Sequence, residues 1–253
     1  MLGKKSILVI LAATLIAVVC CLGFALPVEN HVAIFSGHPN WSPVMESKDN
    51  TSISGIGVNI TRMVLKDAGN IEMDSRYEGQ WDDVLEKLKE GKIDGVVGLY
   101  YTKERKEYTV YSIRYAEDNI SLFFKAGKGF SYNQKEDLIG KKGIATVGDS
   151  YGQEMDDFIA KNNLNMTIVD TPEEAFDLLK EEKADYFIYS LLAGRKVIDE
   201  LKLSGFEESG TVSSQFFYIG ISKKSPYAKY MPLINSSLEK FIQSNGIVKL
   251  ESS

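Results

Sequence analysis

Cysteine is nearly absent from this 253-residue sequence, whose only two cysteines are the adjacent Cys20 and Cys21. Both lie in a hydrophobic stretch near the N-terminus, so the remainder of the chain has none. A disulfide framework, a thiol nucleophile and a cysteine-ligated metal site are therefore excluded for that remainder. Histidine is equally scarce, and His31 and His38 alone do not make up a zinc ligand set. We expect neither a metal nor a cofactor.

An excess of basic charge is also missing. Lysine and arginine number 29 against 35 aspartates and glutamates, which gives a net charge of −6. Nucleic acids and anionic membrane surfaces attract positively charged proteins, so neither is an expected partner. The acidic residues are scattered along the sequence, which is typical of a solvated surface.

The one long hydrophobic run lies at the N-terminus. Lys4 and Lys5 precede the apolar stretch Ile7–Phe24, and the small residues Gly23 and Ala25 stand at positions −3 and −1 of a cleavage site after Ala25. A charged start, an apolar core and small residues at the cleavage site are the pattern of a secretory signal peptide. We predict that residues 1–25 are a signal peptide and that the protein is exported to the periplasm or the outer face of the cell membrane. A retained membrane anchor is the alternative, because a run of this length nearly suffices to span a bilayer.

The stretch Leu88–Arg105 (LKEGKIDGVVGLYYTKER) holds the most informative local pattern. A helix with one apolar face is expected to end at Leu88, and Gly91 suits the left-handed residue that closes it. A short apolar run to Leu99 then predicts a strand that is covered on both faces. Ligands in open α/β sheets bind beyond the carboxyl ends of such strands, so the residues around and after Leu99 are candidates for a site.

Four residues at this strand end are candidate ligand contacts, namely Gly98, Tyr100, Thr102 and Arg105. Thr102 is placed to cap a short helix with free amides. Arg105 adds a permanent cation with a planar fork of donors, which suits a carboxylate. Together these residues predict a site for a small anion. The alternative is a surface arginine that pairs with a neighbouring glutamate.

A similar phrase occurs later in the chain. Leu179–Tyr186 (LKEEKADY) matches Leu88–Gly95 (LKEGKIDG), and an apolar run follows each copy. We interpret the repeat as two similar α/β lobes whose strand ends point at one cleft. Strands and helices are also expected to alternate elsewhere, with strands at Val32–Phe35, Ile71–Tyr77, Ile120–Phe124, Gly143–Val147, Met166–Val169, Tyr186–Tyr189 and Phe216–Ile221, and helices at Val58–Ala68, Gln153–Lys161, Pro172–Glu182, Leu191–Leu201 and Pro232–Gln243.

Two crossings between the lobes are expected. We interpret Glu117-Asp118 as a turn that forms the first crossing and Ser213-Ser214 as the second. Lobe 1 is then residues 26–117 together with 216–253, and lobe 2 is residues 118–215. Two crossings make a hinge, and a cleft between hinged lobes suits a protein that closes on a small ligand.

The pattern as a whole resembles the extracytoplasmic solute-binding proteins of polar amino-acid ABC transporters, the bacterial extracellular solute-binding proteins of family 3. The segments that carry the resemblance are Trp41-Ser42-Pro43, Gly55–Asn59, Trp81–Gly98, Thr102–Arg105, Leu138–Lys142, Gly148–Ser150 and Ala184-Asp185. The resemblance covers nearly all of the chain after the leader. It implies a two-lobe α/β fold of the periplasmic-binding-protein type, in which each lobe is a mixed sheet flanked by helices.

The resemblance also implies roles for single residues. Arg105 resembles the arginine that holds the ligand carboxylate with both arms of its fork. Ser150 lies at the position whose backbone amide meets the same carboxylate from the second lobe. Trp41 and Trp81 lie where the family places aromatic rings against the ligand, although either ring can instead be core. Tyr100 lies where a small hydroxyl residue usually contacts the ligand.

Two departures from the family pattern concern the ligand's ammonium group. Ser190 stands where the family usually has an acid that pairs with the α-ammonium. His38 stands where an aspartate often contributes. An ordinary α-amino acid is therefore not assured as the ligand. Asp149 can substitute as the ammonium partner or can cap the helix that follows, and capping is the favoured interpretation.

The leading hypothesis is a monomeric binding protein, without catalysis, that captures an amino acid or related organic anion for uptake by an ABC transporter permease. The first alternative is a sensory module that presents its liganded state to a receptor. The second is an enzyme similar to a periplasmic dehydratase that shares this fold. Only His38, Asp149 and Glu173 are candidates for a general acid or base, and no nucleophile is paired with a base.

Overall fold

The computed structural model describes residues 32–250. The signal peptide predicted for residues 1–25 lies outside the described residues. None of the helices in the described part has the length and apolar composition that a bilayer span needs.

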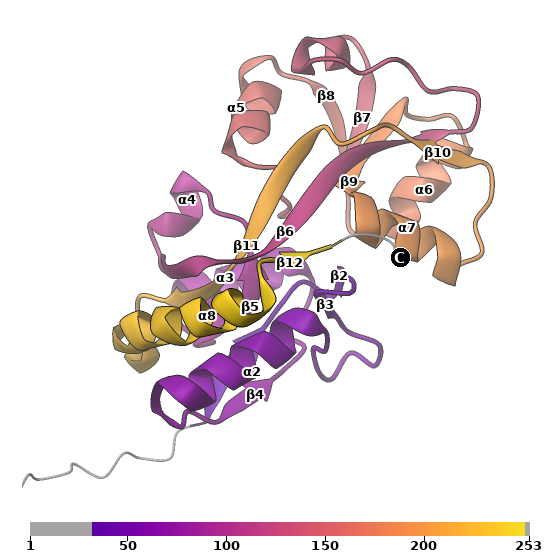
Figure 1. Ribbon diagram of the computed structural model, residues 1–253. Coiled ribbons are helices and arrows are strands. Elements are labelled where there is room, and N and C mark those ends of the chain that lie inside the picture. Colours follow the sequence, from indigo (N-terminus) through magenta and orange to yellow (C-terminus); the bar gives the residue numbers. More distant parts are fainter. Residues whose placement is uncertain (1–31, 251–253) are drawn as a thin grey trace, which may run out of the picture. The chain divides into compact units, whose positions relative to one another are not determined.

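A large mixed sheet with helices packed around it forms the body of the protein (Figure 1). Its main path runs β4-β1-β5-β11-β6-β9-β7-β8, and two short strands, β10 and β12, pair with β6. The strands are β1 (Ala33–Ser36), β4 (Met73–Ser75), β5 (Gly95–Leu99), β6 (Thr109–Lys125), β7 (Lys142–Thr146), β8 (Asn165–Val169), β9 (Tyr186–Ser190), β10 (Phe206–Glu208), β11 (Ser213–Ser222) and β12 (Val248–Lys249). A separate hairpin pairs β2 (Asn40–Trp41) with β3 (Met45–Glu46).

The helices fall into two groups, one at each end of the sheet. The α-helices are α2 (Ile56–Gly69), α3 (Trp81–Glu90), α4 (Lys103–Lys106), α5 (Gln153–Lys161), α6 (Pro172–Lys180), α7 (Leu191–Glu200) and α8 (Met231–Asn245). Short 3-10 helices occupy Lys135–Leu138 and Pro226–Tyr230. The first lobe carries β1, β4 and β5 with α2, α3 and α8, and the second lobe carries β7, β8 and β9 with α5, α6 and α7 (Figure 1). The two-lobe α/β fold expected from the sequence is therefore confirmed.

Two long strands, β6 and β11, run from one lobe to the other (Figure 1). The turn expected at Glu117-Asp118 is wrong, because both residues lie inside β6. They form ladder pairs with β11, Glu117 with Phe216 and Asp118 with Gln215. The lobe boundaries predicted after residues 117 and 215 thus fall at adjacent rungs of one ladder, and as boundaries they stay predictions.

The polar residues at this crossing suggested a turn. The burial of every second residue is instead the pattern of a β-strand. Ala116, Asp118 and Ile120 alternate with more exposed neighbours, and each of the three is at most 1 % exposed. Alternate residues of a strand share one face, so Asp118 lies on the buried face of β6. A buried carboxylate is tolerated in a strand only when its oxygens accept hydrogen bonds.

The local signals at helix ends are confirmed. Thr171 accepts a hydrogen bond from the amide of Glu174 and Pro172 stands in the first turn, so α6 begins where it was expected. Gly91 closes α3 with φ +77°, a left-handed conformation that favours glycine. Because α3 ends there, the chain turns directly into β5, and the end of β5 carries the candidate site.

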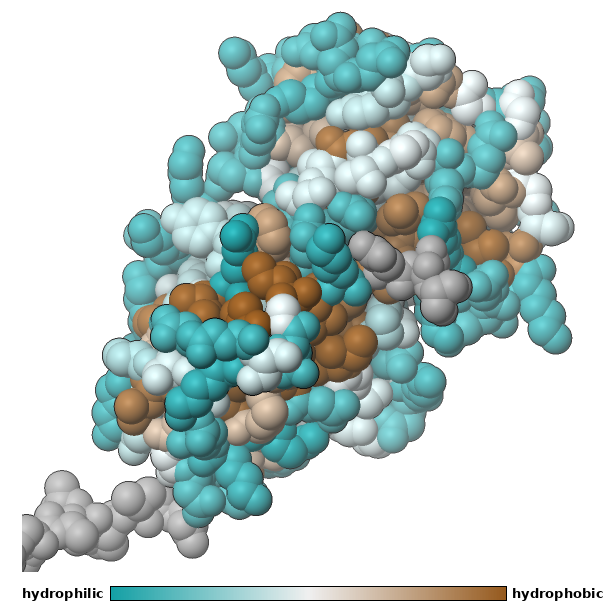
Figure 2. All heavy atoms as spheres, in the orientation of Figure 1, coloured by the Kyte–Doolittle hydropathy of each residue, from teal (hydrophilic) through white to brown (hydrophobic). Residues whose placement is uncertain are grey.

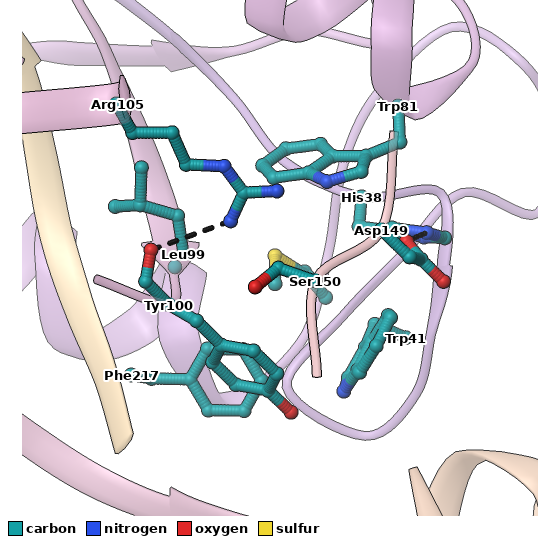
Figure 3. A pocket seen from close by; sticks show the side chains of 11 residues that line it. His38, Trp41, Trp81, Leu99, Tyr100, Arg105, Asp149, Ser150 and Phe217 are labelled. Atoms are coloured by element: carbon teal, nitrogen blue, oxygen red, sulfur yellow. Dashed lines mark hydrogen bonds and ion pairs between the residues drawn. The ribbon is translucent and has the colours of Figure 1, made fainter. Parts of the chain in front are cut away.

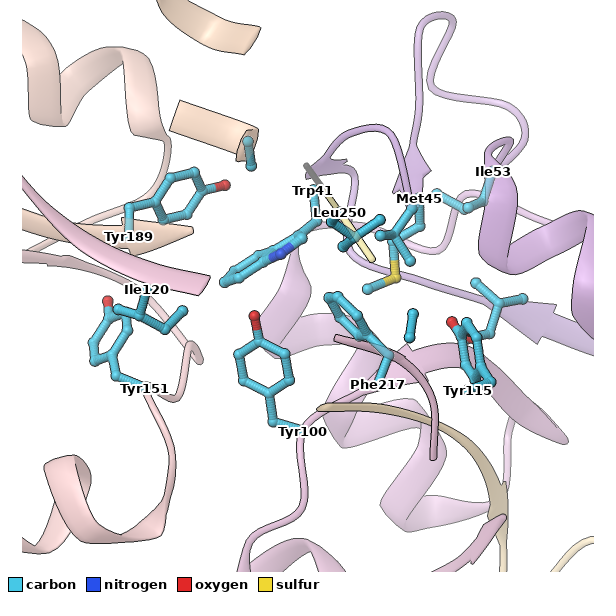
Figure 4. Packing of buried hydrophobic residues seen from close by; sticks show 14 of the residues in the cluster. Trp41, Met45, Ile53, Tyr100, Tyr115, Ile120, Tyr151, Tyr189, Phe217 and Leu250 are labelled. Atoms are coloured by element: carbon cyan, nitrogen blue, oxygen red, sulfur yellow. The ribbon is translucent and has the colours of Figure 1, made fainter. Parts of the chain in front are cut away.

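Apolar side chains fill both lobes and also the space between them. Figure 4 shows Trp41 and Tyr100 lying between Ile120 and Tyr189 on one side and Phe217 on the other. These side chains belong to one buried cluster that extends through the molecule. On the face seen in Figure 2, hydrophilic side chains cover most of the surface, and hydrophobic ones gather over the lobe that carries α2 and α8.

The strand β5 admits no side chain at its first residue. A Cβ on Gly95 would lie 2.4 Å from the Phe35 ring and 2.7 Å from the carbonyl oxygen of Gly220. The neighbouring strands β1 and β11 therefore pack against bare backbone at this point.

Replacing Gly95 with alanine is expected to lower the free energy of unfolding by about 1–3 kcal/mol, because the added methyl group overpacks the core. The change is measured by urea denaturation. Gly210→Ala is the control, since a Cβ there meets nothing within 4 Å, and its effect is expected to stay within about 0.5 kcal/mol. Equal stability of the Gly95→Ala variant and the wild type would contradict the packing described for β5.

Candidate functional site

A small cavity lies where the end of β5 meets the loop after β7 (Figure 3). Its volume is about 10 Å³, which is room for about one water molecule. Side chains from both lobes line it: His38, Trp41, Met45, Trp81, Gly98, Leu99, Tyr100, Arg105, Asp149, Ser150 and Phe217. Eight of the ten residues predicted from the sequence are among them.

Arg105 reaches the cavity from α4. Thr102 begins this helix by accepting a hydrogen bond from the amide of Arg105 at 3.1 Å, which is the capping role expected for it. The Arg105 side chain is buried, and its guanidinium lies 5.7 Å from the centre of the Trp81 ring. Trp81 is the first residue of α3, so the start of that helix forms one wall of the cavity (Figure 3).

The guanidinium of Arg105 bridges the two lobes. It donates to the carbonyl oxygen of Tyr100 at 3.3 Å and to that of Gly148, in the second lobe, at 2.8 Å. Within residues 32–250 no carboxylate forms an ion pair with it. Arg105 is therefore not a surface residue that pairs with a neighbouring glutamate. A buried guanidinium whose bonds go to neutral carbonyls keeps its full positive charge available to a ligand.

The second lobe contributes the turn Gly148–Ser150. Gly148 has φ +74°, which turns its carbonyl oxygen toward Arg105. Asp156, in the first turn of α5, accepts hydrogen bonds from the Ser150 hydroxyl and from the Tyr151 amide. Burial raises the pKa of Asp156, and these hydrogen bonds act against that rise. Two donors just before α5 are thus taken by the protein's own carboxylate.

His38 and Asp149 form a second contact between the lobes. His38 Nε2 lies 3.0 Å from Asp149 Oδ1. His38 Nδ1 accepts a hydrogen bond from the amide of Asn40 at 3.0 Å, so the ring's proton is on Nε2 and is donated to Asp149. Thr146 also donates to Asp149. The favoured interpretation of Asp149 as a helix cap is wrong, because the N-cap of α5 is Gly152, no side chain caps this helix, and Asp149 faces His38 across the cleft.

Asp118 is the polar residue at the site that the sequence did not reveal. The Trp41 indole and the Tyr100 hydroxyl donate to its Oδ2 at 2.8 and 2.5 Å, and the Ser190 hydroxyl donates to its Oδ1 at 3.0 Å. Burial raises the pKa of Asp118, while these three hydrogen bonds act to lower it. The signal that could have found it is the strand alternation that places residues 116, 118 and 120 on one buried face.

The remaining predicted residues lie around this carboxylate. Tyr100 keeps its proton because burial, and next the charge of Asp118, raises the pKa of its hydroxyl. Ser190 does not line the cavity; it begins α7 by accepting from the Ala193 amide while it donates to Asp118. Trp41 is in edge contact with both His38 and Tyr100, at 4.9 and 5.6 Å between ring centres.

A larger groove opens beside the cavity. Its volume is about 730 Å³, and it shares Arg105, Asp149 and Ser150 with the cavity. Charged side chains of α3, α4 and α5 form its other walls. The groove thus brings solvent up to the residues that surround the guanidinium.

No group of histidine, cysteine, aspartate or glutamate within residues 32–250 could hold a metal ion. The site instead combines one arginine, two acids and a set of aromatic rings. This chemistry suits the binding of a small polar molecule.

Comparison with known proteins identifies the family. The sequence profile of the bacterial extracellular solute-binding proteins, family 3, matches residues 34–252. The chain belongs to this family. Family 3 proteins bind small solutes outside the cytoplasm, and the similar structures described below are binding proteins or a sensor domain rather than enzymes. No curated protein sequence matches the chain significantly.

Solved structures share the fold of this family 3 protein. A histidine kinase sensor domain with similarity to periplasmic binding proteins superposes with a TM-score of 0.72 at 18% identity, over 85% of this chain and 92% of the other. An ancestral arginine-binding protein bound to arginine gives 0.70 at 22% identity, over 85% and 94%. The arginine-, lysine-, histidine-binding protein ArtJ from Geobacillus stearothermophilus gives 0.68 at 19% identity, over 85% and 90%.

The raised pKa of Asp118 gives a testable dependence of stability on pH. The folded protein holds a proton on this carboxyl at pH values where the unfolded chain has lost it. The stability associated with the carboxyl is therefore complete below its unfolded pKa of about 3.9 and is lost as the pH rises through the folded pKa. We expect the unfolding free energy of the wild type, relative to Asp118→Asn, to be highest at acidic pH and to fall toward neutral pH. Urea denaturation at a series of pH values measures this, and a difference that does not vary with pH contradicts it.

Proposed function

We propose that this protein captures a small carboxylate-bearing solute, an amino acid or a related organic anion, in the cleft between its lobes for ABC-type uptake. The observation that carries the proposal is the buried Arg105 fork, which faces the turn Gly148–Ser150 across the cavity and has no ion pair within residues 32–250. A planar guanidinium in such a position favours a carboxylate held by two parallel hydrogen bonds.

Closure of the lobes is the proposed response to the ligand. Arg105 and Trp81 belong to the first lobe, and Asp149 and Ser150 belong to the second. The cavity between them has room for about one water molecule, so the lobes must open to admit a solute, which then touches residues of both. A ligand shifts a conformational equilibrium only by its different affinity for the two states. Contacts from both lobes exist only when the lobes are together, so the ligand favours the closed state. A membrane permease then receives the closed form.

The similar structures support an amino acid as the solute. The ancestral protein is described as bound to arginine, and ArtJ as a protein that binds arginine, lysine and histidine. Their identity to this chain is low, so the ligand of this protein is inferred from its own residues first. The predicted leader fits a protein that works in the periplasm or on the outer face of the membrane.

A sensory module is the second candidate. The observation that favours it is the histidine kinase sensor domain, which shares the fold over most of both chains. Both candidates use the same cleft and differ in the partner that recognises the closed form. Neighbouring genes for a transporter permease favour uptake, and neighbouring genes for a signalling receptor favour the sensor.

Replacing Arg105 with glutamine is expected to reduce ligand-induced stabilisation to about half or less of its wild-type value. A carboxylate that saturates the wild type at about a hundredfold excess over Kd adds about 2.7 kcal/mol, which raises Tm by about 5–10 °C for a domain of this size. Losing hydrogen bonds to a charged group weakens binding by about ten- to a hundredfold. Differential scanning fluorimetry with a panel of amino acids and small organic acids measures the shift.

Lys106→Gln is the matched control for Arg105→Gln. Lys106 is the next residue of α4 and carries the same charge, but it lies against the Tyr101 ring and does not line the cavity. It is expected to keep the wild-type shift. Failure of every carboxylate in the panel to stabilise the wild type, or an equal shift in the Arg105→Gln variant, would overturn the proposed function.

A further inference from the structure

Asp118 is a buried acid without a cationic partner. Its three side-chain donors, from Trp41, Tyr100 and Ser190, are all neutral. No lysine, arginine or histidine within residues 32–250 pairs with it, although it is only 1 % exposed. A buried carboxylate compensated by neutral donors alone is costly to keep charged, and a cation beside it would lower that cost.

Asp118 is held from the second-lobe side by Ser190, whose hydroxyl donates to Asp118 Oδ1 at 3.0 Å. Its other oxygen, Oδ2, accepts only from first-lobe side chains, those of Trp41 and Tyr100. Asp118 and Ser190 come from different strands, which pair through Ile120 and Ser190.

Tyr100 joins this acid to the arginine of the cleft. Its carbonyl oxygen accepts from Arg105 and its hydroxyl donates to Asp118. The two charges are thus separated by the length of a tyrosine side chain. An α-amino acid has its own charges one carbon apart, so its ammonium cannot reach Asp118 while its carboxylate is on Arg105. A cation at the far end of the ligand can reach it.

The walls between the cavity and Asp118 are two aromatic rings. Trp41 and Tyr100 both line the cavity, and both donate to the same oxygen of Asp118. Figure 4 shows the two rings side by side between the lobes. When the lobes separate, Trp41 and Tyr100 move away with the first lobe, while Ser190 stays beside Asp118 because β9 pairs with β6. A ligand ammonium with three donors can then replace the two neutral donors of Asp118 Oδ2.

We propose that Asp118 is the acidic end of the ligand site and binds a cationic group at the end of the ligand that is distal to the carboxylate. This inference rests on the proposed function, because Arg105 must hold the carboxylate. The ligand class is then an amino carboxylate with a terminal ammonium or guanidinium group. Asp149 lines the same cavity as Arg105 and is the proposed partner of an α-ammonium.

Ornithine and norvaline test this directly, because they differ only in the terminal ammonium. Isothermal titration calorimetry measures both Kd values on the wild type and on Asp118→Asn. We expect the wild type to prefer ornithine, and we expect the substitution to reduce the ratio of affinities by about tenfold or more. A change in lobe closure or in folded fraction alters both affinities together and cancels in the ratio, so a purely structural role for Asp118 leaves the ratio unchanged.

Two further variants sharpen the test. Asp94→Asn is the matched control: Asp94 also accepts from a serine hydroxyl and a neutral amide, at 2.7 and 2.8 Å, but it precedes β5 at the end opposite Tyr100. It is expected to keep the wild-type ratio. Tyr100→Phe removes one neutral donor from Asp118, so the ratio is expected to rise.

The outcomes separate this inference from the proposed function. If both amino acids bind through Arg105 but the ratio does not respond to Asp118→Asn, the distal acidic site is wrong and carboxylate capture stands. If neither binds at millimolar concentration while another carboxylate stabilises the wild type, the distal acidic site is wrong and carboxylate capture stands. If no carboxylate binds, or if Arg105→Gln binds as tightly as the wild type, both proposals are overturned.

Discussion

The buried guanidinium of Arg105 is the constraint on which the site depends. A permanent cation taken out of water needs acceptors on every side. In this protein two carbonyl oxygens supply them, one from the end of β5 and one from the glycine turn after β7. The first lobe therefore cannot satisfy its own arginine completely. The second lobe, or a ligand carried between the lobes, supplies the remaining acceptors.

Other polar contacts in the cleft also join residues of the two lobes. His38 of the first lobe meets Asp149 of the second, and the Tyr189 hydroxyl of β9 donates to the Asn40 carbonyl oxygen at 2.8 Å. Asp118 collects donors from both sides. The contacts of His38, Tyr189 and Trp41 join groups that lie on opposite sides of the cleft, whereas Ser190 and Asp118 lie on the paired strands β9 and β6. Closure of the lobes thus forms hydrogen bonds for polar groups that are buried in the cleft. A ligand either replaces some of these hydrogen bonds or adds new ones.

Local sequence signals predicted most of the fold. The glycine after α3 and the threonine and proline before α6 mark those helix ends, because each acts through its own backbone chemistry. The same strand-end argument placed Arg105 and Tyr100 beside one cavity. The first crossing between the lobes was predicted wrongly. The composition of Glu117-Asp118 predicts a turn, but the strand β6 continues through both residues. Asp118 is tolerated there because its carboxylate accepts hydrogen bonds from residues distant in the sequence. Such donors cannot be deduced from neighbours in the chain, and neither can the orientation of Asp149 toward His38.

The most direct measurement is a crystal structure of the protein grown with the carboxylate that stabilises it most. The account predicts that the two oxygens of the ligand's carboxylate lie within hydrogen-bond distance of the Arg105 guanidinium, with the ring of Trp81 close by and the turn Gly148–Ser150 on the opposite side. A ligand bound elsewhere, with the guanidinium still bonded only to the carbonyl oxygens of Tyr100 and Gly148, would contradict it.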